Sequence, residues 1–331
     1  MTRRAGVALV CAAALAALYT GPHWLSLYNV VIAFTFFTYV TLAQAWNLIG
    51  GYGGQFSLGH AMFVGIGSYA TALLLIHTSL PLWSTVVLSG LVASVVAAVA
   101  AIPLLRLRSV YFAVGTLGVS LAALSWMINW GYSGKTSGLN IPTSVFLSFD
   151  DLYYAAGSLA VFTTAAVFLI SRSPYGLRLM SVRDDEDAAA ELGVDGFRVK
   201  LAAFALSAFF VGVAGALIAI QKLNLEPYSA FSLTFTTNMI IMTVIGGLGT
   251  IAGPVIGSFL IFELQQQLQG YQDWSTLITG LLLVAIIRVA PGGIWGLVVR
   301  AAERLRATAR MPRASTTDGA LVGRNEQARA R

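Results

Sequence analysis

Long apolar runs alternate with short polar or glycine-rich connections along the chain. Ten of these runs are long enough, or nearly so, to cross the hydrocarbon layer of a bilayer as helices. They cover residues 5–19, 25–49, 58–77, 82–105, 110–130, 152–170, 201–221, 231–247, 251–268 and 274–289. This pattern predicts an all-α polytopic membrane protein with about ten transmembrane helices. The first run follows Arg3 and Arg4 and is also typical of a signal peptide, so both interpretations stay open.

The composition supports the membrane interpretation. Of the 331 residues, 57% are hydrophobic and only 10% are charged, and the mean hydropathy is +0.77. A soluble domain usually has about 25% charged residues. The formal net charge is +6, but the basic residues flank apolar runs, which argues against a nucleic-acid partner. The one cysteine, Cys11, excludes an intramolecular disulfide.

The distribution of Lys and Arg predicts the topology. With ten crossings, 18 of the 20 basic residues fall on one side, and only Lys135 and Lys222 lie opposite. Because cytoplasmic loops carry the excess of Lys and Arg, both termini and the charged loop 171–200 are expected in the cytoplasm. We therefore expect a transmembrane domain over residues 1–299 and a basic cytoplasmic tail, partly disordered, over residues 300–331.

The charged loop 171–200 contains a short predicted helix. Asp184 or Asp185 can cap its first turn, a run of alanines propagates it, and Gly193 fits the left-handed position that ends a helix. A helix of small residues on a polar loop suits docking of a soluble partner. A solvated connecting helix is the open alternative.

Two glycine turns interrupt the apolar pattern: the first glycine turn, residues 50–54, and the second glycine turn, residues 246–249. The glycines expected to have structural roles are Gly51, Gly54, Gly59, Gly246, Gly247 and Gly249. Gly249, Gly253 and Gly257 also have the four-residue spacing that lets two helices approach closely.

Polar side chains gather near the first glycine turn. Polar groups inside a membrane are costly and usually face a pathway or another helix. We expect a solute pathway or its gate to be formed by Asn47, Gln55, Ser57, His60 and Asn238. Hydrogen bonds between helices are the alternative role, and for a lone Asn or Gln they are favoured.

The sequence contains no catalytic constellation and no metal-ligand spacing. His23, His60 and His77 are isolated, and the GKT at residues 134–136 lacks the first glycine and the preceding strand of a phosphate-binding loop. We therefore expect no enzyme activity, metal or cofactor on this chain.

Several stretches together resemble one known family. They are GYGGQFSLGHAMFVGIGSY at residues 51–69, LRLRSVYFAVGT at 105–116, the region 174–217 with RDDEDAAAELGVDGFRVK, the region 238–257, and PGGIWGL at 291–297. In this order they resemble LivM-type permeases of branched-chain amino acid ABC transporters.

The resemblance implies a permease subunit of an importer in the bacterial cytoplasmic (inner) membrane. It implies that cytoplasmic ABC ATPases, which bind ATP and Mg²⁺, drive transport, and that a second homologous permease and an extracytoplasmic solute-binding protein complete the complex. It also implies that the charged loop is the site of ATPase coupling. The coupling residues would be Asp187, Ala188, Ala189, Glu191 and Gly193, with Asp187 in place of the usual Glu.

The solute implied is a branched-chain or related hydrophobic amino acid. The outer stretch SGKTSGL at 133–139 departs from close relatives, so a permease for urea, short amides or another small polar solute remains an alternative. A membrane receptor or scaffold without transport is a second alternative, although it does not explain the polar cluster.

Overall fold

A computed structural model describes residues 22, 26–107, 110–142, 147–268, 278, 280–281, 288, 292–297 and 299–300. Eight of the ten predicted runs fall inside these ranges, and each of the eight contains a helix. The runs 5–19 and 274–289 and the tail 300–331 lie almost entirely outside the described residues.

The described elements are mostly helices. They are α2 (Leu27–Asn47), α3 (Ala61–His77), α4 (Leu82–Leu104), α5 (Val110–Asn129), α6 (Phe149–Arg172), α7 (Pro174–Asp184), α8 (Glu186–Glu191), α9 (Gly196–Lys222), α10 (Pro227–Ala230), α11 (Leu233–Gly246) and α12 (Ala252–Gln267). A π-helical turn, η1 (Leu48–Tyr52), extends α2, and two 3₁₀ turns, η2 (Gly131–Ser133) and η3 (Lys135–Ser137), precede β1 (Leu139–Asn140). This strand pairs antiparallel with β2 (Asn224–Leu225).

Six helical segments of the described chain are long and apolar enough to cross a membrane, and α3 is a shorter apolar helix. Helix α6 begins three residues before the predicted run because Ser148 and Asp151 form a capping box at its start. The expected fold class, a helical polytopic membrane protein, agrees with this architecture. The described chain therefore accounts for six candidate crossings of the ten expected.

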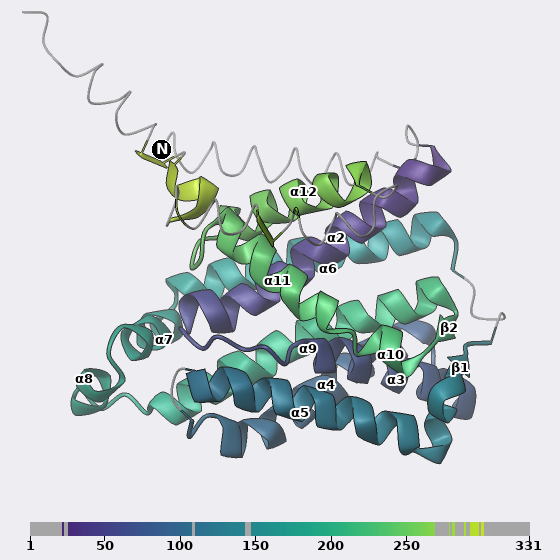
Figure 1. Cartoon of the computed structure of the whole chain (residues 1–331), viewed down its shortest axis with the longest axis horizontal. Coiled ribbons are helices and arrows are strands. Elements are labelled where there is room, and N and C mark those ends of the chain that lie inside the picture. Colours follow the sequence, from purple (N-terminus) through teal and green to yellow (C-terminus); the bar gives the residue numbers. More distant parts are fainter. Residues whose placement is uncertain are drawn as a thin grey trace, which may run out of the picture.

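Helix α9 lies at the centre of the bundle (Figure 1) and packs against α2, α3, α4 and α6. In its most apolar stretch 83% of the residues are buried, against 28% in α5. Large apolar side chains on the outer helices are instead exposed, among them Val95, Tyr111 and Trp126. A continuous apolar exterior around an apolar interior is what lipid contact requires.

The charged loop and the β1–β2 pair lie at opposite ends of the bundle. Figure 1 shows the long helices running between an end with α7 and α8 and an end with the two strands and α10. The charged loop 171–200 and the polar loop after α5 are thus separated by the length of the helices. This is expected, because one helix, α6, connects the two loops and a single crossing places them on opposite sides of a membrane.

Helices α11 and α12 pack at very short range through glycines. A Cβ on Gly253 would overlap the backbone of Gly246 and Gly247, and a Cβ on Gly257 would overlap the Met242 carbonyl. The close helix approach predicted from the glycine spacing is confirmed for these two helices.

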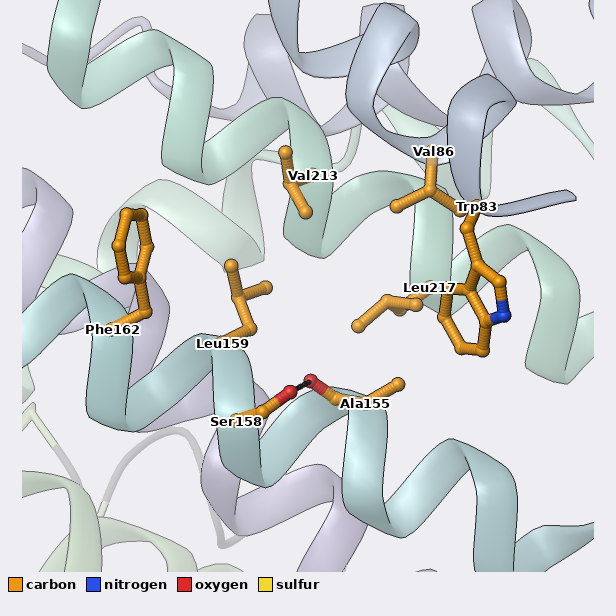
Figure 2. Close-up of a pocket in the computed structure, with 8 residues that line it drawn as sticks. All are labelled: Trp83, Val86, Ala155, Ser158, Leu159, Phe162, Val213 and Leu217. Atoms are coloured by element: carbon orange, nitrogen blue, oxygen red, sulfur yellow. Dashed lines mark hydrogen bonds between the residues drawn. The ribbon is translucent and has the colours of Figure 1, made fainter.

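An open apolar groove of about 280 Å³ lies between α4, α6 and α9. Figure 2 shows Trp83 at one end and Phe162 at the other, with Leu217 and Val213 from α9 between them. Ser158 is the one polar side chain lining it, and its hydroxyl donates to the Ala155 carbonyl at 2.9 Å. The groove contains none of the predicted pathway residues and suits an acyl chain better than a polar solute.

Candidate functional site

Segment 53–60, which connects η1 to α3, has no regular secondary structure although it lies within the bundle. In Figure 1 its dark purple trace runs from the α7 end toward the middle of the molecule. Where such a segment is buried, its backbone donors need partners in the protein. The Leu58 N–H donates to Thr116 Oγ1 at 3.0 Å, and the Ala61 N–H donates to Thr236 Oγ1 at 2.7 Å. The apolar run predicted a helix from Leu58, but α3 begins at Ala61. These bonds explain the later start, because they give the backbone before Ala61 partners outside a helix.

His60 is part of a chain of buried hydrogen bonds. Its Nδ1 lies 2.8 Å from Ser57 Oγ, and its Nε2 lies 3.0 Å from Ser207 Oγ. The Ser207 hydroxyl donates to the Ala45 carbonyl at 2.6 Å, so Ser207 must accept from His60. This fixes the proton on Nε2 and makes Nδ1 the acceptor for Ser57. All three polar side chains are fully buried, and the geometry therefore favours packing of α2, α3 and α9 over a role in solute contact.

Asn47 connects the two glycine turns. Its Nδ2 donates to the Thr250 carbonyl at 2.8 Å, and its Oδ1 accepts from the Gly249 N–H at 2.9 Å. One turn earlier, Gln44 Nε2 donates to the Ile251 carbonyl at 2.7 Å, while its buried Oε1 has no hydrogen-bond partner among the described residues. The end of α2 is thereby fixed to the loop between α11 and α12.

Gln55 differs from the other members of the polar cluster. Its side chain is half-buried and makes no hydrogen bond to the described residues, although its N–H donates to the Ile49 carbonyl. The adjacent Phe56 is 43% exposed and packs edge-on against Trp46 at 5.2 Å between ring centroids. Among the predicted pathway residues, Gln55 is therefore the one whose side-chain amide has no hydrogen bond to the described residues, and it lies next to the exposed ring of Phe56.

Asn238 lies apart from this cluster, on α11. Its Oδ1 accepts from Gln265 Nε2 at 3.3 Å, and Gln265 Oε1 accepts from the Tyr39 hydroxyl at 3.2 Å. This polar bridge joins α2, α11 and α12. None of these hydrogen bonds joins Asn238 to Gln55, Ser57 or His60.

The two glycine turns are in direct backbone contact. A Cβ on Gly51 would lie 2.5 Å from the Gly249 nitrogen. A Cβ on Gly247 would lie 3.1 Å from the Gly292 carbonyl oxygen, and a Cβ on Gly293 would lie 2.5 Å from the Gly247 backbone. Gly59 packs against the Thr116 carbonyl so closely that a side chain there would overlap it. The expected structural roles of these glycines therefore have a physical basis in close backbone approach.

Helix α8 has the capping expected from the sequence. The Asp185 carboxylate accepts from the N–H groups of Asp187 and Ala188, both at 3.0 Å. At the other end, the Gly193 N–H donates to Ala190 and the next N–H donates to Ala189, with Gly193 at φ +82°. This is a Schellman motif, in which glycine avoids the strain of a left-handed conformation.

The exposed face of α8 is only partly the one expected. Ala189 is 2% exposed and packs inside the chain, whereas Ala188 and Glu191 are exposed. Leu192, which the sequence suggested only as a residue that propagates the helix, is 83% exposed at its end. Leucines exposed singly are common on protein surfaces, so Leu192 gave no signal in the sequence; its place at the tip of α8 is seen only in the structure.

Two contacts attach α7 and α8, within the charged loop, to the first turns of α9. Lys200, 3% exposed, forms an ion pair with Glu186 at 2.6 Å between Nζ and Oε2. The Tyr175 hydroxyl donates to the Val199 carbonyl at 2.6 Å. Burial raises the pKa of Tyr175 to about 12, so the phenol stays protonated and keeps this bond at physiological pH.

The sequence analysis missed the partners that make the site. Thr116 and Ser207 are isolated hydroxyl residues in apolar helices, and Thr236 is one of several threonines at the start of α11, so polarity inside an apolar run was the only signal that could have selected them. Arg183 was seen only as one charge in the loop, yet its Nη1 donates to the Gly51 carbonyl at 3.2 Å. No group of His, Cys, Asp and Glu in the described part of the chain could hold a metal ion.

Comparison with known proteins identifies relatives over most of the chain. The family described as branched-chain amino acid transport system / permease component matches residues 28–287. The high-affinity branched-chain amino acid transport system permease protein LivM of Salmonella typhimurium is 28% identical over 303 residues, which cover 82% of this chain and 71% of that protein. The protein of the same name from Escherichia coli is 27% identical over the same shares.

More distant relatives include permeases that are named for other solutes. The xylose transport system permease protein XylH of Escherichia coli is 26% identical over 171 residues, 49% of this chain and 38% of that protein. No solved structure matches the chain. Since the family match spans well over half of the residues, the chain belongs to the family of permease components of branched-chain amino acid transport systems.

Proposed function

We propose that this chain is the membrane-spanning permease subunit of an ABC importer for branched-chain or related hydrophobic amino acids. Separate cytoplasmic ATPases drive it, a second homologous permease completes the pathway, and an extracytoplasmic binding protein delivers the solute. The chain itself performs no chemistry, and ATP and Mg²⁺ belong to the ATPases. The bacterial inner membrane is its location.

The observation that carries this proposal is helix α8. It protrudes at one end of the bundle (Figure 1), its ends are fixed by Asp185 and Gly193, and it presents Leu192 to the surroundings. A short rigid helix with an exposed apolar tip fits a groove on a soluble partner, and a purely solvated connection has no need of either feature. The family membership supplies the class of partner.

Transport by a reconstituted complex tests the function. The chain is assembled in proteoliposomes with the ATPases, second permease and binding protein encoded beside it, and uptake of labelled leucine, isoleucine and valine is measured with and without ATP. We expect ATP-dependent uptake of at least one of the three. Uptake of urea or a short amide alone favours the polar-solute alternative, and an assembled complex that moves none of these solutes favours a receptor or scaffold.

Labelling of single cysteines tests the topology of ten crossings with both termini inside. Thr136 and Ala190 are exposed at the two ends of the bundle, so each is replaced by Cys in a Cys11→Ser background. An impermeant thiol reagent added to intact cells should modify Thr136→Cys and leave Ala190→Cys unmodified. Equal labelling of the two from outside contradicts the proposed topology.

A further inference from the structure

Arg183 lies where the charged loop meets both glycine turns. It occupies the last turn of α7, immediately before the residues that cap α8. Its Nη1 donates to the Gly51 carbonyl at 3.2 Å, and its Nε and Nη2 contact Asp184 Oδ1 at 2.9 and 2.7 Å. The side chain is 34% exposed, so it covers the junction without being sealed inside it.

The packing of glycines around this side chain shows how closely it fits. A Cβ on Gly54, which has φ +67°, would lie 2.5 Å from Arg183 Cγ, and a Cβ on Gly249 would lie 3.4 Å from its Nη1. Gly51 and Gly249 are themselves in contact, and Asn47 lies beside both: its Oδ1 accepts from the Gly249 N–H and would overlap a Cβ placed on Gly51. One guanidinium group and its stem therefore touch both glycine turns at once.

Two polar contacts near α8 connect it to the bundle, one from α8 itself and one from the end of α7, and they differ in what they can move. The Glu186–Lys200 ion pair leads to α9, whose most apolar stretch is 83% buried, so this helix cannot shift without repacking the core. Arg183 leads to the two glycine turns, where a π-helical turn replaces the α-helix at Gly51 and where Gly54, Gly247 and Gly249 have positive φ, so small rotations of φ and ψ change the direction of the chain. Movement of α8 is thus transmitted more readily through α7 and Arg183.

We propose that Arg183 is a positioning residue that couples displacement of α8 to the two glycine turns and, through them, to α3 and α12. This inference rests on the proposed function, because it requires an ATPase that moves α8. The guanidinium group is suited to the task since it can bind a carbonyl and a carboxylate simultaneously in one fixed plane. Arg183 contacts no solute in this account and acts only through the backbone.

The test compares variants of Arg183 in the complete reconstituted complex. Arg183→Gln removes the charge at similar length, Arg183→Lys keeps the charge but not the fork of donors, and Arg178→Gln is the matched control on the exposed face of the same helix. Solute uptake, ATP hydrolysis and ATPase co-purification are measured on each preparation. We expect Arg183→Gln to retain the ATPases and their hydrolysis, with uptake per ATP lowered about tenfold. Arg183→Lys should be intermediate and Arg178→Gln unchanged.

Two outcomes overturn the inference. Unchanged uptake per ATP in Arg183→Gln means that the contact with Gly51 transmits nothing. Loss of ATPase co-purification in Arg183→Gln places the residue in docking and not in transmission. Either result is distinguishable from failure of the proposed function, in which the wild-type complex itself shows no ATP-dependent uptake.

Discussion

Helix α8 and segment 53–60 are both short, but they are stabilised in opposite ways. The bonds that define α8 are local, because Asp185 caps a helix two and three residues away and Gly193 ends it within the same stretch. Segment 53–60 and its flanks depend on Thr116, Ser207 and Thr236, which are 58, 147 and 175 residues distant in sequence from their partners.

This difference separates a movable element from a fixed one. A helix with local caps keeps its own shape when its surroundings change, which suits an element that a partner displaces. A segment bonded to several helices moves only together with those helices, because separating it from them breaks buried hydrogen bonds, each of which leaves an unpaired polar group at a cost of about 1–3 kcal/mol. We therefore expect substitutions near segment 53–60 to affect stability and substitutions in α8 to affect coupling.

The largest effect is expected at Gly59. A methyl group there overlaps the Thr116 carbonyl, so Gly59→Ala should lower the free energy of unfolding by about 3 kcal/mol through overpacking. The matched control is Gly118→Ala on the exposed face of α5, where a Cβ meets nothing within 4 Å. Thermal unfolding in detergent is the measurement. A Gly59→Ala protein as stable as the control means that segment 53–60 is not tightly packed.

The second effect separates His60 from Gln55. His60→Leu removes the acceptor for Ser57 and the donor to Ser207, and should cost about 2 kcal/mol of stability. Gln55→Leu breaks no hydrogen bond between described residues, so it should leave stability unchanged and reduce uptake if Gln55 lines the pathway. Unfolding curves and uptake are recorded for both variants. Normal uptake by Gln55→Leu argues against the pathway role, and unchanged stability of His60→Leu argues against the structural one.

A smaller loss of stability than in Gly59→Ala is expected for a β-branched residue at Gly193. No atom lies within 4 Å of a Cβ placed there, so Gly193→Val costs only the strain of the left-handed backbone, about 1–2 kcal/mol. That strain should displace the end of α8 and weaken ATPase co-purification while membrane insertion stays normal. Gly193→Asn is the control, because Asn tolerates this conformation. Equal co-purification of both variants with the ATPases contradicts the role given to α8.

Features that depend on local contacts, as in α8, could be predicted from the sequence, whereas features that depend on distant residues, as around segment 53–60, could not. The apolar runs located eight helices, and the order of Asp185, the alanines and Gly193 predicted α8, since these signals act over a few residues. The sequence did not show that Ala189 faces inward while Leu192 faces outward, because that depends on how α8 sits on α9. It also grouped Asn47, Ser57, His60 and Asn238 as pathway candidates, although contacts with distant residues decide whether each side chain is free or bonded.

The central claim is that α8 is the surface on which the ATPases dock, and chemical protection of Leu192 tests it most directly. Leu192→Cys and Ser57→Cys are made separately in a Cys11→Ser background and treated with a thiol reagent in inside-out vesicles. The account predicts rapid modification of Leu192→Cys, loss of that reactivity when the ATPases are bound, and slow modification of the buried Ser57→Cys in both states. A Leu192→Cys protein that reacts equally fast with and without bound ATPases contradicts the account.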